Sequence, residues 1–371
     1  MLKLKDVAGA VCLAVLSSGA AQAIEVTANF DYTSVGADNL ANSLLSDDPL
    51  NGISNVSAVV TGHTKKIFTT VADDIRDVRD ASTTGTFTNL NNTWGLADGI
   101  IMSTGDVKHY ETDYPAAGGF NDPSISTDYT LALIDGVGEG QHTGFFPTAE
   151  QNALLTSVTS VVPEFKDVSQ FTVQFDVAAG VDKVYFSVVF GTEEMDENGT
   201  IPDPSFQDAL GIFLDNSLGQ SNIATFDNLG SQDAVNSSHS FMLSQGADGS
   251  GGVTALNGIL DPSGGSGSPV MLFVANVETG STNTLTFILG DAKDGIKDST
   301  VYISGLTTYD PRCDGSYPGT AGGGNTSQFD STVCDTTGGT DPDPTAVSEP
   351  TSLALLGLGL LAFASRKRKL H

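Results

Sequence analysis

The stretch that decides the fold is residues 171–190, which read FTVQFDVAAGVDKVYFSVVF. Residues 171–177 alternate apolar and polar side chains, and residues 184–190 repeat the alternation after a turn around Gly180. A period of two is typical of β-strands that bury one face. The stretch therefore predicts two consecutive β-strands.

Further strand-like segments are separated by clusters of Gly, Asn, Asp and Pro, which are typical of turns. They are Ala209–Leu214, Val270–Val277, Thr284–Leu289 and Thr300–Leu306. A helix is predicted where a capping box at residues 148–151 precedes apolar residues at helical spacing. Many short strands with glycine-rich turns predict a mainly β fold, an antiparallel β-sandwich with one or two short helices.

The N-terminal half of the chain has a weaker pattern. Residues 73–80 are compatible with a helix or a loop, whereas strands are predicted at Ala58–Val60, Ile67–Val71 and Ile100–Ser103. After Tyr309 the composition changes, and residues 310–347 are rich in Gly, Ser, Thr, Asp and Pro. This composition predicts a stalk that follows a folded domain at residues 24–309.

The N-terminus has the three parts of a secretory signal peptide, which we expect at residues 1–23. Two lysines precede a short apolar segment at residues 7–16, and Ala21 and Ala23 form a small-x-small cleavage site. We therefore expect a signal peptidase to cut after Ala23 and to release an exported chain that begins at Ile24.

Residues 348–371 form a second signal with three parts. The polar motif Ser348-Glu349-Pro350 precedes an apolar run from Leu353 to Ala364, and four basic residues follow at 366–369. A permanent span needs about 20 apolar residues, so this shorter run predicts a transient membrane insertion with its basic cluster on the cytoplasmic side.

This tail resembles the PEP-CTERM sorting signal, with Ser348 in place of the usual first proline. The resemblance implies cleavage by an exosortase in a Gram-negative bacterium that makes extracellular polysaccharide. The alternative is an ordinary C-terminal membrane anchor.

The chain is strongly acidic, with a formal net charge of −29. Of its 16 basic and 45 acidic residues, the signal peptide and the residues after Pro350 together hold six and one, which leaves a balance of −34 for the processed chain. Such an excess argues against nucleic acid as a partner, because like charges repel. It favours cations, above all calcium, although an acidic surface also serves solubility alone.

Two cysteines remain after the signal peptide, Cys313 and Cys334, and they bracket a Gly-, Ser- and Thr-rich stretch of the predicted stalk. Two cysteines in an oxidising compartment are expected to pair with each other. A closed loop of about twenty residues contributes about 3 kcal/mol in the chain-entropy model. We therefore expect a local disulfide in the stalk.

Four segments between residues 39 and 309 resemble the bacterial choice-of-anchor L domain. Two are specific as a pair: FGTEE at 190–194 with FQDALGIFL at 206–214, and GDAKDGIKDSTVYI at 290–303. The other two lie at residues 44–62 and at residues 99–105, which read GIIMSTG. Gln207 and Lys297 depart from the family's usual Asn and aromatic residue. The family is named for the varied surface anchors that follow it, so the resemblance implies a surface protein without naming an activity.

Acidic residues gather at the predicted strand ends within these segments. Calcium takes six to eight oxygen ligands, and carboxylates on neighbouring loops can supply several of them. The candidate calcium ligands are Glu193, Glu194, Asp208, Asp291, Asp294 and Asp298. We place Glu194, Asp208 and one of Asp294 and Asp298 first among them. The alternative is that these acids cap turns by accepting hydrogen bonds from backbone N–H groups.

A hydrolase is the alternative function, because paired carboxylates such as Glu193 or Glu194 with Asp208 can cleave glycosides. However, Trp94 is the single tryptophan, whereas sugar clefts use aromatic platforms, and neither Gly-x-Ser-x-Gly nor His-Glu-x-x-His occurs. We therefore expect a non-enzymatic protein, exported to the cell surface or extracellular matrix. Its expected role is structural or adhesive in an exopolysaccharide biofilm or floc, with polysaccharide or another matrix protein as partner and calcium as stabiliser.

Overall fold

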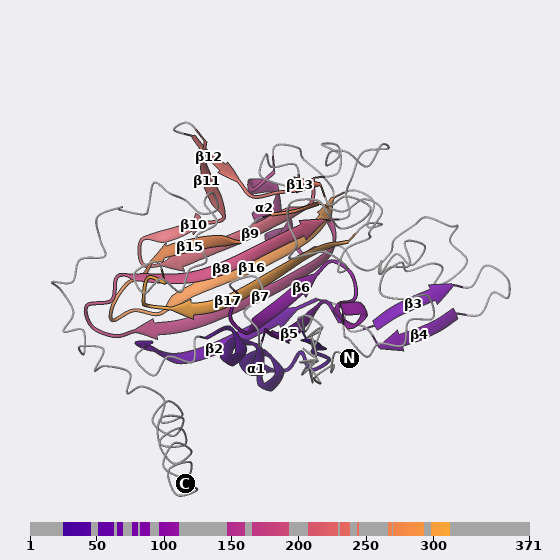
Figure 1. The fold of residues 1–371 in the computed structure, drawn as a ribbon, viewed down its shortest axis with the longest axis horizontal. Coiled ribbons are helices and arrows are strands. Elements are labelled where there is room, and N and C mark those ends of the chain that lie inside the picture. Colours follow the sequence, from indigo (N-terminus) through magenta and orange to yellow (C-terminus); the bar gives the residue numbers. More distant parts are fainter. Residues whose placement is uncertain are drawn as a thin grey trace, which may run out of the picture. The chain divides into compact units, whose positions relative to one another are not determined.

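The computed structural model describes one domain within residues 25–311 (Figure 1). The described residues are 25–45, 51–62, 65–69, 76–80, 82–89, 96–110, 147–159, 165–192, 207–228, 231–237, 243–244, 266–268, 270–292 and 298–311. They form two antiparallel sheets, two α-helices and a short 3-10 helix at Val107–Tyr110. The predicted mainly β sandwich with one or two short helices is confirmed. Among these residues, no helix is long and apolar enough to cross a membrane.

The larger sheet has eight strands and is centred on β17. Their order is β1 (Glu25–Ala28), β5 (Thr84–Thr88), β6 (Gly99–Ser103), β17 (Ser299–Thr307), β8 (Lys183–Thr192), β14 (Ser266–Gly267) and β13 (Leu243–Ser244), with β15 (Met271–Asn276) also paired to β8. The smaller sheet has five strands, in the order β10 (Gly219–Asn222), β9 (Ala209–Asn216), β16 (Asn283–Ala292), β7 (Phe165–Val177) and β2 (Ile53–Thr61).

Two ribbons of two strands complete the described structure: β3 (Lys65–Thr69) with β4 (Arg76–Asp80), and β11 (Thr225–Asn228) with β12 (Ser231–Ala234). Strand β4 corrects the expectation of a helix or loop at residues 73–80. It pairs with β3 from Lys65 opposite Asp80 to Thr69 opposite Arg76. Its sequence, RDVRD, has a single apolar residue, so strand pairing and not an apolar face defines it.

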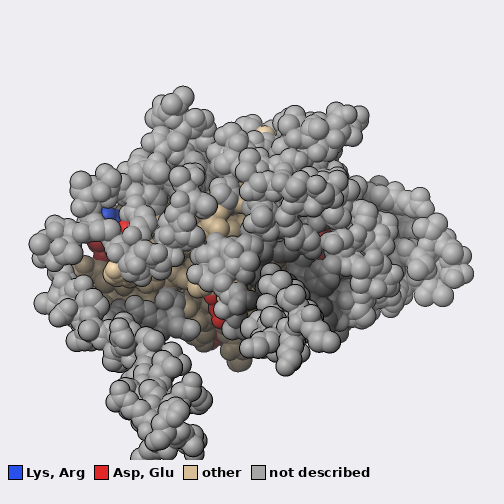
Figure 2. Space-filling model, viewed as in Figure 1, with Lys and Arg blue, Asp and Glu red and all other residues tan. Residues whose placement is uncertain are grey.

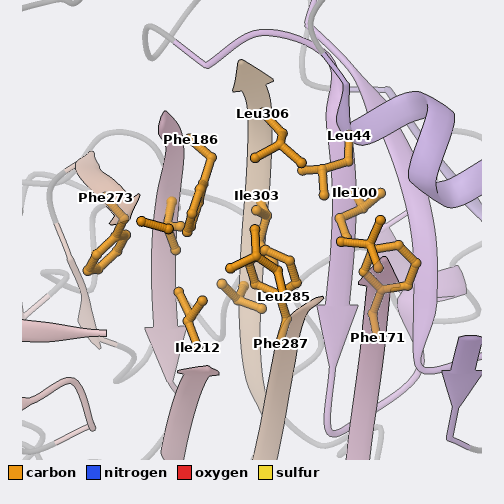
Figure 3. Packing of buried hydrophobic residues seen from close by; sticks show 14 of the residues in the cluster. Leu44, Ile100, Phe171, Phe186, Ile212, Phe273, Leu285, Phe287, Ile303 and Leu306 are labelled. Carbon is orange, nitrogen blue, oxygen red and sulfur yellow. The ribbon is translucent and has the colours of Figure 1, made fainter. Parts of the chain in front are cut away.

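The alternation seen in the sequence builds the core between the two sheets. Phe171 and Phe287 extend from the smaller sheet, and Phe186 and Phe273 from the larger one (Figure 3). The Phe171 and Phe287 rings stack with centroids 6.3 Å apart, and Phe186 meets Phe287 edge-on at 5.5 Å. Burying such side chains contributes about 1.5–3 kcal/mol each, so this interlocked layer holds the sheets together.

Two helices cover parts of the sheets. Helix α1 (Ser34–Leu44) buries Leu40 and Leu44 in the core and packs against β2, β6 and β17. Helix α2 (Ala149–Ser157) buries Leu155 in a smaller apolar cluster with residues of β7, β9 and β16. The predicted capping box of α2 is confirmed: the Thr148 hydroxyl accepts from the Gln151 N–H at 3.2 Å, and the Gln151 side chain accepts from the Thr148 N–H at 3.0 Å.

The strands define two ends of the sandwich. At what we call the turn end, β7, β9, β15 and β17 finish and β8, β10 and β16 begin, with connections at residues 178–182, 217–218 and 277–282. At what we call the motif end, β6, β8 and β16 finish and β9 and β17 begin. Three of the four family-like segments have strand ends at the motif end, namely those at 99–105, 190–214 and 290–303.

Candidate functional site

The interior of the sandwich changes from apolar to polar at the motif end. Every second side chain of a strand lies on the same face. At the motif end, a step of two residues along the chain leads to a polar residue in each strand or directly beside its end. The steps start from the core residues Phe190, Leu210, Leu289, Val301 and Met102. We call the five polar residues the polar layer, and each is at most 1% exposed: Thr192, Asp208, Asp291, Ser299 and Thr104.

Asp208 is the centre of the hydrogen bonds in the polar layer. One carboxyl oxygen accepts from the backbone N–H of Ala292 at 3.0 Å. The other accepts from the hydroxyls of Ser299 at 2.6 Å and Thr192 at 3.3 Å. A single side chain just before β9 therefore connects the ends of β8, β16 and β17, which belong to both sheets.

Asp208 and Asp291 are neighbours on adjacent strands. Ala209 pairs with Gly290, so these two acids lie one position beyond that pair at the ends of β9 and β16. Burial raises the pKa of Asp208 to about 7, against the lowering effect of its hydrogen bonds, one of which is with Asp291. Two ionised carboxylates in contact repel, so such a pair favours a shared proton or a bound cation.

Ser299 joins the polar layer to the GIIMSTG segment of β6. Its backbone carbonyl accepts from the Thr104 N–H, and its N–H donates to the Thr104 hydroxyl, both at 2.9 Å. The Ser103 hydroxyl also donates to the Ser299 carbonyl at 3.3 Å. The family-like segment at 99–105 is therefore bonded directly to the one at 290–303, which belongs to the specific pair.

The structure describes three of the six predicted ligands, and of these it places Asp208 and Asp291 next to each other. Asp208, Asp291 and Asp298 are all buried, and Asp298 directly precedes Ser299 of the polar layer. Glu193, Glu194 and Asp294 lie outside the described residues. Within the described part of the chain, no group of three His, Cys, Asp or Glu side chains is placed to hold a metal ion.

Other predicted sites also lie outside the described residues. They are the cysteines Cys313 and Cys334, the sorting motif Ser348-Glu349-Pro350, and the cleavage residues Ala21 and Ala23. The sequence reasoning missed the hydroxyl partners of Asp208, which are Thr192 and Ser299, and their neighbour Thr104. The period of two could have found them. Each lies two residues beyond the last apolar residue on the buried face of its strand.

Two models of known protein families match the chain. A family model described as the choice-of-anchor L domain matches residues 26–307. A second model, described as the PEP-CTERM protein-sorting motif, matches residues 346–369. Both resemblances seen in the sequence are confirmed. No curated protein and no solved structure matches the chain.

Proposed function

Because the chain belongs to the choice-of-anchor L family and carries a PEP-CTERM sorting motif, we propose that it is a structural or adhesive component of an exopolysaccharide matrix. The two matches indicate an exported, surface-associated protein that an exosortase processes. The proposal extends this to a biofilm or floc of a Gram-negative bacterium. Extracellular polysaccharide or another matrix protein is the proposed partner.

The burial of Asp208 is the observation that favours a structural role over a polysaccharide hydrolase. A glycosidase needs two carboxyl groups that face an open cleft, with room for the sugar and for water. Asp208 has no exposed surface, and its oxygens accept three hydrogen bonds from neighbouring strands. A polymer therefore has no access to this carboxyl group in the folded domain.

Calcium is the proposed stabiliser of the motif end. Asp208 and Asp291 are buried side by side, and a cation would offset the repulsion between their ionised forms. Glu193 and Glu194 follow Thr192 of the polar layer, and Asp294 follows Ala292 by two residues, so the adjoining connections supply further carboxylates. On the described surface in Figure 2, red areas of Asp and Glu exceed the blue of Lys and Arg, which also suits a cation.

Chelation of the purified exported chain tests the calcium proposal. Removing calcium is expected to lower the melting temperature, since free calcium at 100 times its dissociation constant contributes about 2.7 kcal/mol. Asp208→Asn should abolish most of the response. Asp215→Asn, which changes an exposed acid on the strand that follows Asp208, should keep it. Unchanged melting in chelator, with no metal in the purified protein, would show that these acids only cap strand ends.

Two further measurements separate the functional alternatives. Intact mass of secreted protein should show a chain that begins near Ile24 and ends near Pro350. Mature surface protein that still carries residues 366–369 would contradict exosortase processing. Hydrolysis of the host exopolysaccharide that is lost in Glu194→Gln, at unchanged melting temperature, would favour the hydrolase instead.

A further inference from the structure

We propose that the corner at Asn51–Gly52 is a clamp that holds the C-terminal end of β17 against tension. The inference rests on the proposed structural role in the matrix and takes the C-terminal side as the point of attachment, because residues 308–311 follow β17 and precede the sorting motif at 346–369. Strand β17 lies between β6 and β8 in the middle of the larger sheet. Any pull on the domain from its C-terminal side is therefore applied first to the end of a core strand.

The end of β17 is held weakly by its own sheet. Pairing with β6 stops at Ser304, and the register with β8 shifts between Ser304 and Thr307. Gly305 lies inside this interruption with a φ of 69°, a left-handed conformation that breaks the regular ladder. The last residues of β17 therefore need contacts from outside the sheet to resist peeling.

The segment after α1 supplies those contacts. Leu45 forms a parallel bridge with Leu306. The Asn51 side chain donates to the Leu306 carbonyl and accepts from the Thr308 N–H, both at 3.1 Å. The Thr308 hydroxyl donates to the Asn51 carbonyl at 2.5 Å. Asn51 is only 8% exposed, so water competes little for these bonds.

The same corner is fixed to the smaller sheet. Gly52 adopts a φ of 66°, and its carbonyl accepts from the Ala178 N–H at 2.8 Å, directly after β7. Strand β2 begins at the next residue, Ile53. A pull on the end of β17 must therefore break bonds that lead into both sheets. This gives the Asn51–Gly52 part of the family-like segment 44–62 a role that the polar layer does not explain.

Asn283 offers a matched control at the same end of the sandwich. It is fully buried, and its side chain makes three hydrogen bonds that close the connection between β15 and β16. It donates to the carbonyls of Glu278 at 2.9 Å and Ser281 at 3.3 Å, and it accepts from the Glu278 N–H at 2.8 Å. Asn51 and Asn283 therefore resemble each other in burial and bonding, but only Asn51 contacts the exit of the chain.

Constant-force unfolding tests the clamp, with handles at the N-terminus and after residue 347 of the exported chain. Asn51→Ala and Asn283→Ala should both lower the melting temperature. Only Asn51→Ala should also raise the unfolding rate under force, by about ten-fold, which corresponds to about 1.4 kcal/mol in the barrier. Hydrogen exchange should rise at the Thr308 amide in the same variant.

Thr308 gives a milder second test in case Asn51→Ala fails to fold. Thr308→Val removes the hydroxyl donor and should raise the unfolding rate under force. Thr308→Ser keeps the donor, so its unfolding rate should stay close to that of wild type. Equal effects of force on the Asn51 and Asn283 variants, or no difference between Thr308→Val and Thr308→Ser, would overturn the clamp. The measurement uses purified protein, so it is independent of whether the chain is attached in the cell.

Discussion

The turn end and the motif end of the sandwich both use a carboxyl group to tie strand ends together, but they place it differently. At the turn end, Glu278 is only partly buried and accepts from the Ser217 N–H at 3.1 Å and the Ser281 hydroxyl at 3.2 Å. At the motif end, Asp208 is buried and accepts three hydrogen bonds. Hydrogen bonds from Ser217 lower the pKa of Glu278, whereas burial raises the pKa of Asp208 to about 7. Access to water therefore decides the direction of the shift.

Both ends include bonds between distant residues, but the turn end also has local ones. Asn283 bonds residues two and five positions away in the sequence, whereas Asn51 bonds residues 255 and 257 positions away. The motif end depends on residues far apart, since Asp208 bonds Ala292 and Ser299, which are 84 and 91 positions away. The bonds of Asp208 should therefore form later in folding than the local bonds of Asn283.

Replacing the central carboxyl of each end should give the largest contrast. Asp208→Ala leaves buried N–H and hydroxyl donors without an acceptor, so the free energy of unfolding should fall by about 3 kcal/mol. Glu278→Ala removes a group that keeps contact with water and should have a much smaller effect. Urea unfolding of both variants and wild type checks this. Similar losses in the free energy of unfolding for the two variants would contradict the expected difference between the ends.

The two ends should also respond to pH with opposite signs when calcium is chelated. Folding raises the pKa of Asp208 from 3.8 to about 7, so its contribution is full below pH 3.8 and is lost as the pH rises through about 7. Folding lowers the pKa of Glu278 from 4.5, so its contribution is present above pH 4.5 and is lost as the pH falls through the lowered value.

Melting temperature measured across pH in chelator checks this sign difference. Asp208→Asn should remove the decline toward pH 7, and Glu278→Gln should change the profile only at acid pH. Added calcium should flatten the decline in wild type, because the ion favours the ionised carboxylate. A profile that does not change in Asp208→Asn would show that another group governs stability near neutral pH.

Glycine-to-alanine substitutions at the two ends should destabilise the domain for different reasons. At the motif end, a Cβ on Gly290 would lie 2.6 Å from Leu155 Cδ1, and this overpacking beneath α2 should cost about 1–3 kcal/mol. At the turn end, Gly180 has open space but a φ of 87°, and the strained backbone should cost about 1 kcal/mol. A Leu155→Ala substitution should rescue Gly290→Ala in part, and it should leave Gly180→Ala unrescued.

The smallest effect is expected in the stalk, beyond both ends. Cys313 and Cys334 lie outside the described domain, so reducing their predicted disulfide should leave the main melting transition unchanged. Non-reducing peptide mapping should first recover the linked pair. Two free thiols in exported protein would contradict the pairing, and a large fall in melting temperature on reduction would place the bond within the folded unit.

The sequence alone predicted the elements that a local pattern controls. The period of two predicted β7 and β8, and apolar segments between turn-like clusters predicted β9, β15, β16 and β17, whereas the short strands β10 to β14 were not predicted. The residues around Thr148 and Gln151 predicted α2 with its capping box. These predictions succeed because burial of one face and satisfaction of helix-end N–H groups act between near neighbours. Helix α1 was not predicted, because Leu40 and Leu44 are set among small and polar residues and gain their burial from β2, β6 and β17.

Only the tertiary structure decided how these elements pair and which residues at their ends are buried together. The consecutive strands β7 and β8 enter different sheets. The alternation of apolar and polar residues that both strands share does not predict this. The sequence showed acids at strand ends, but convergence of the strands made Asp208 the buried partner of Thr192, Ala292 and Ser299. The physical reason is that a side-chain pattern records which face is buried, whereas pairing and desolvation depend on contacts between distant parts of the chain.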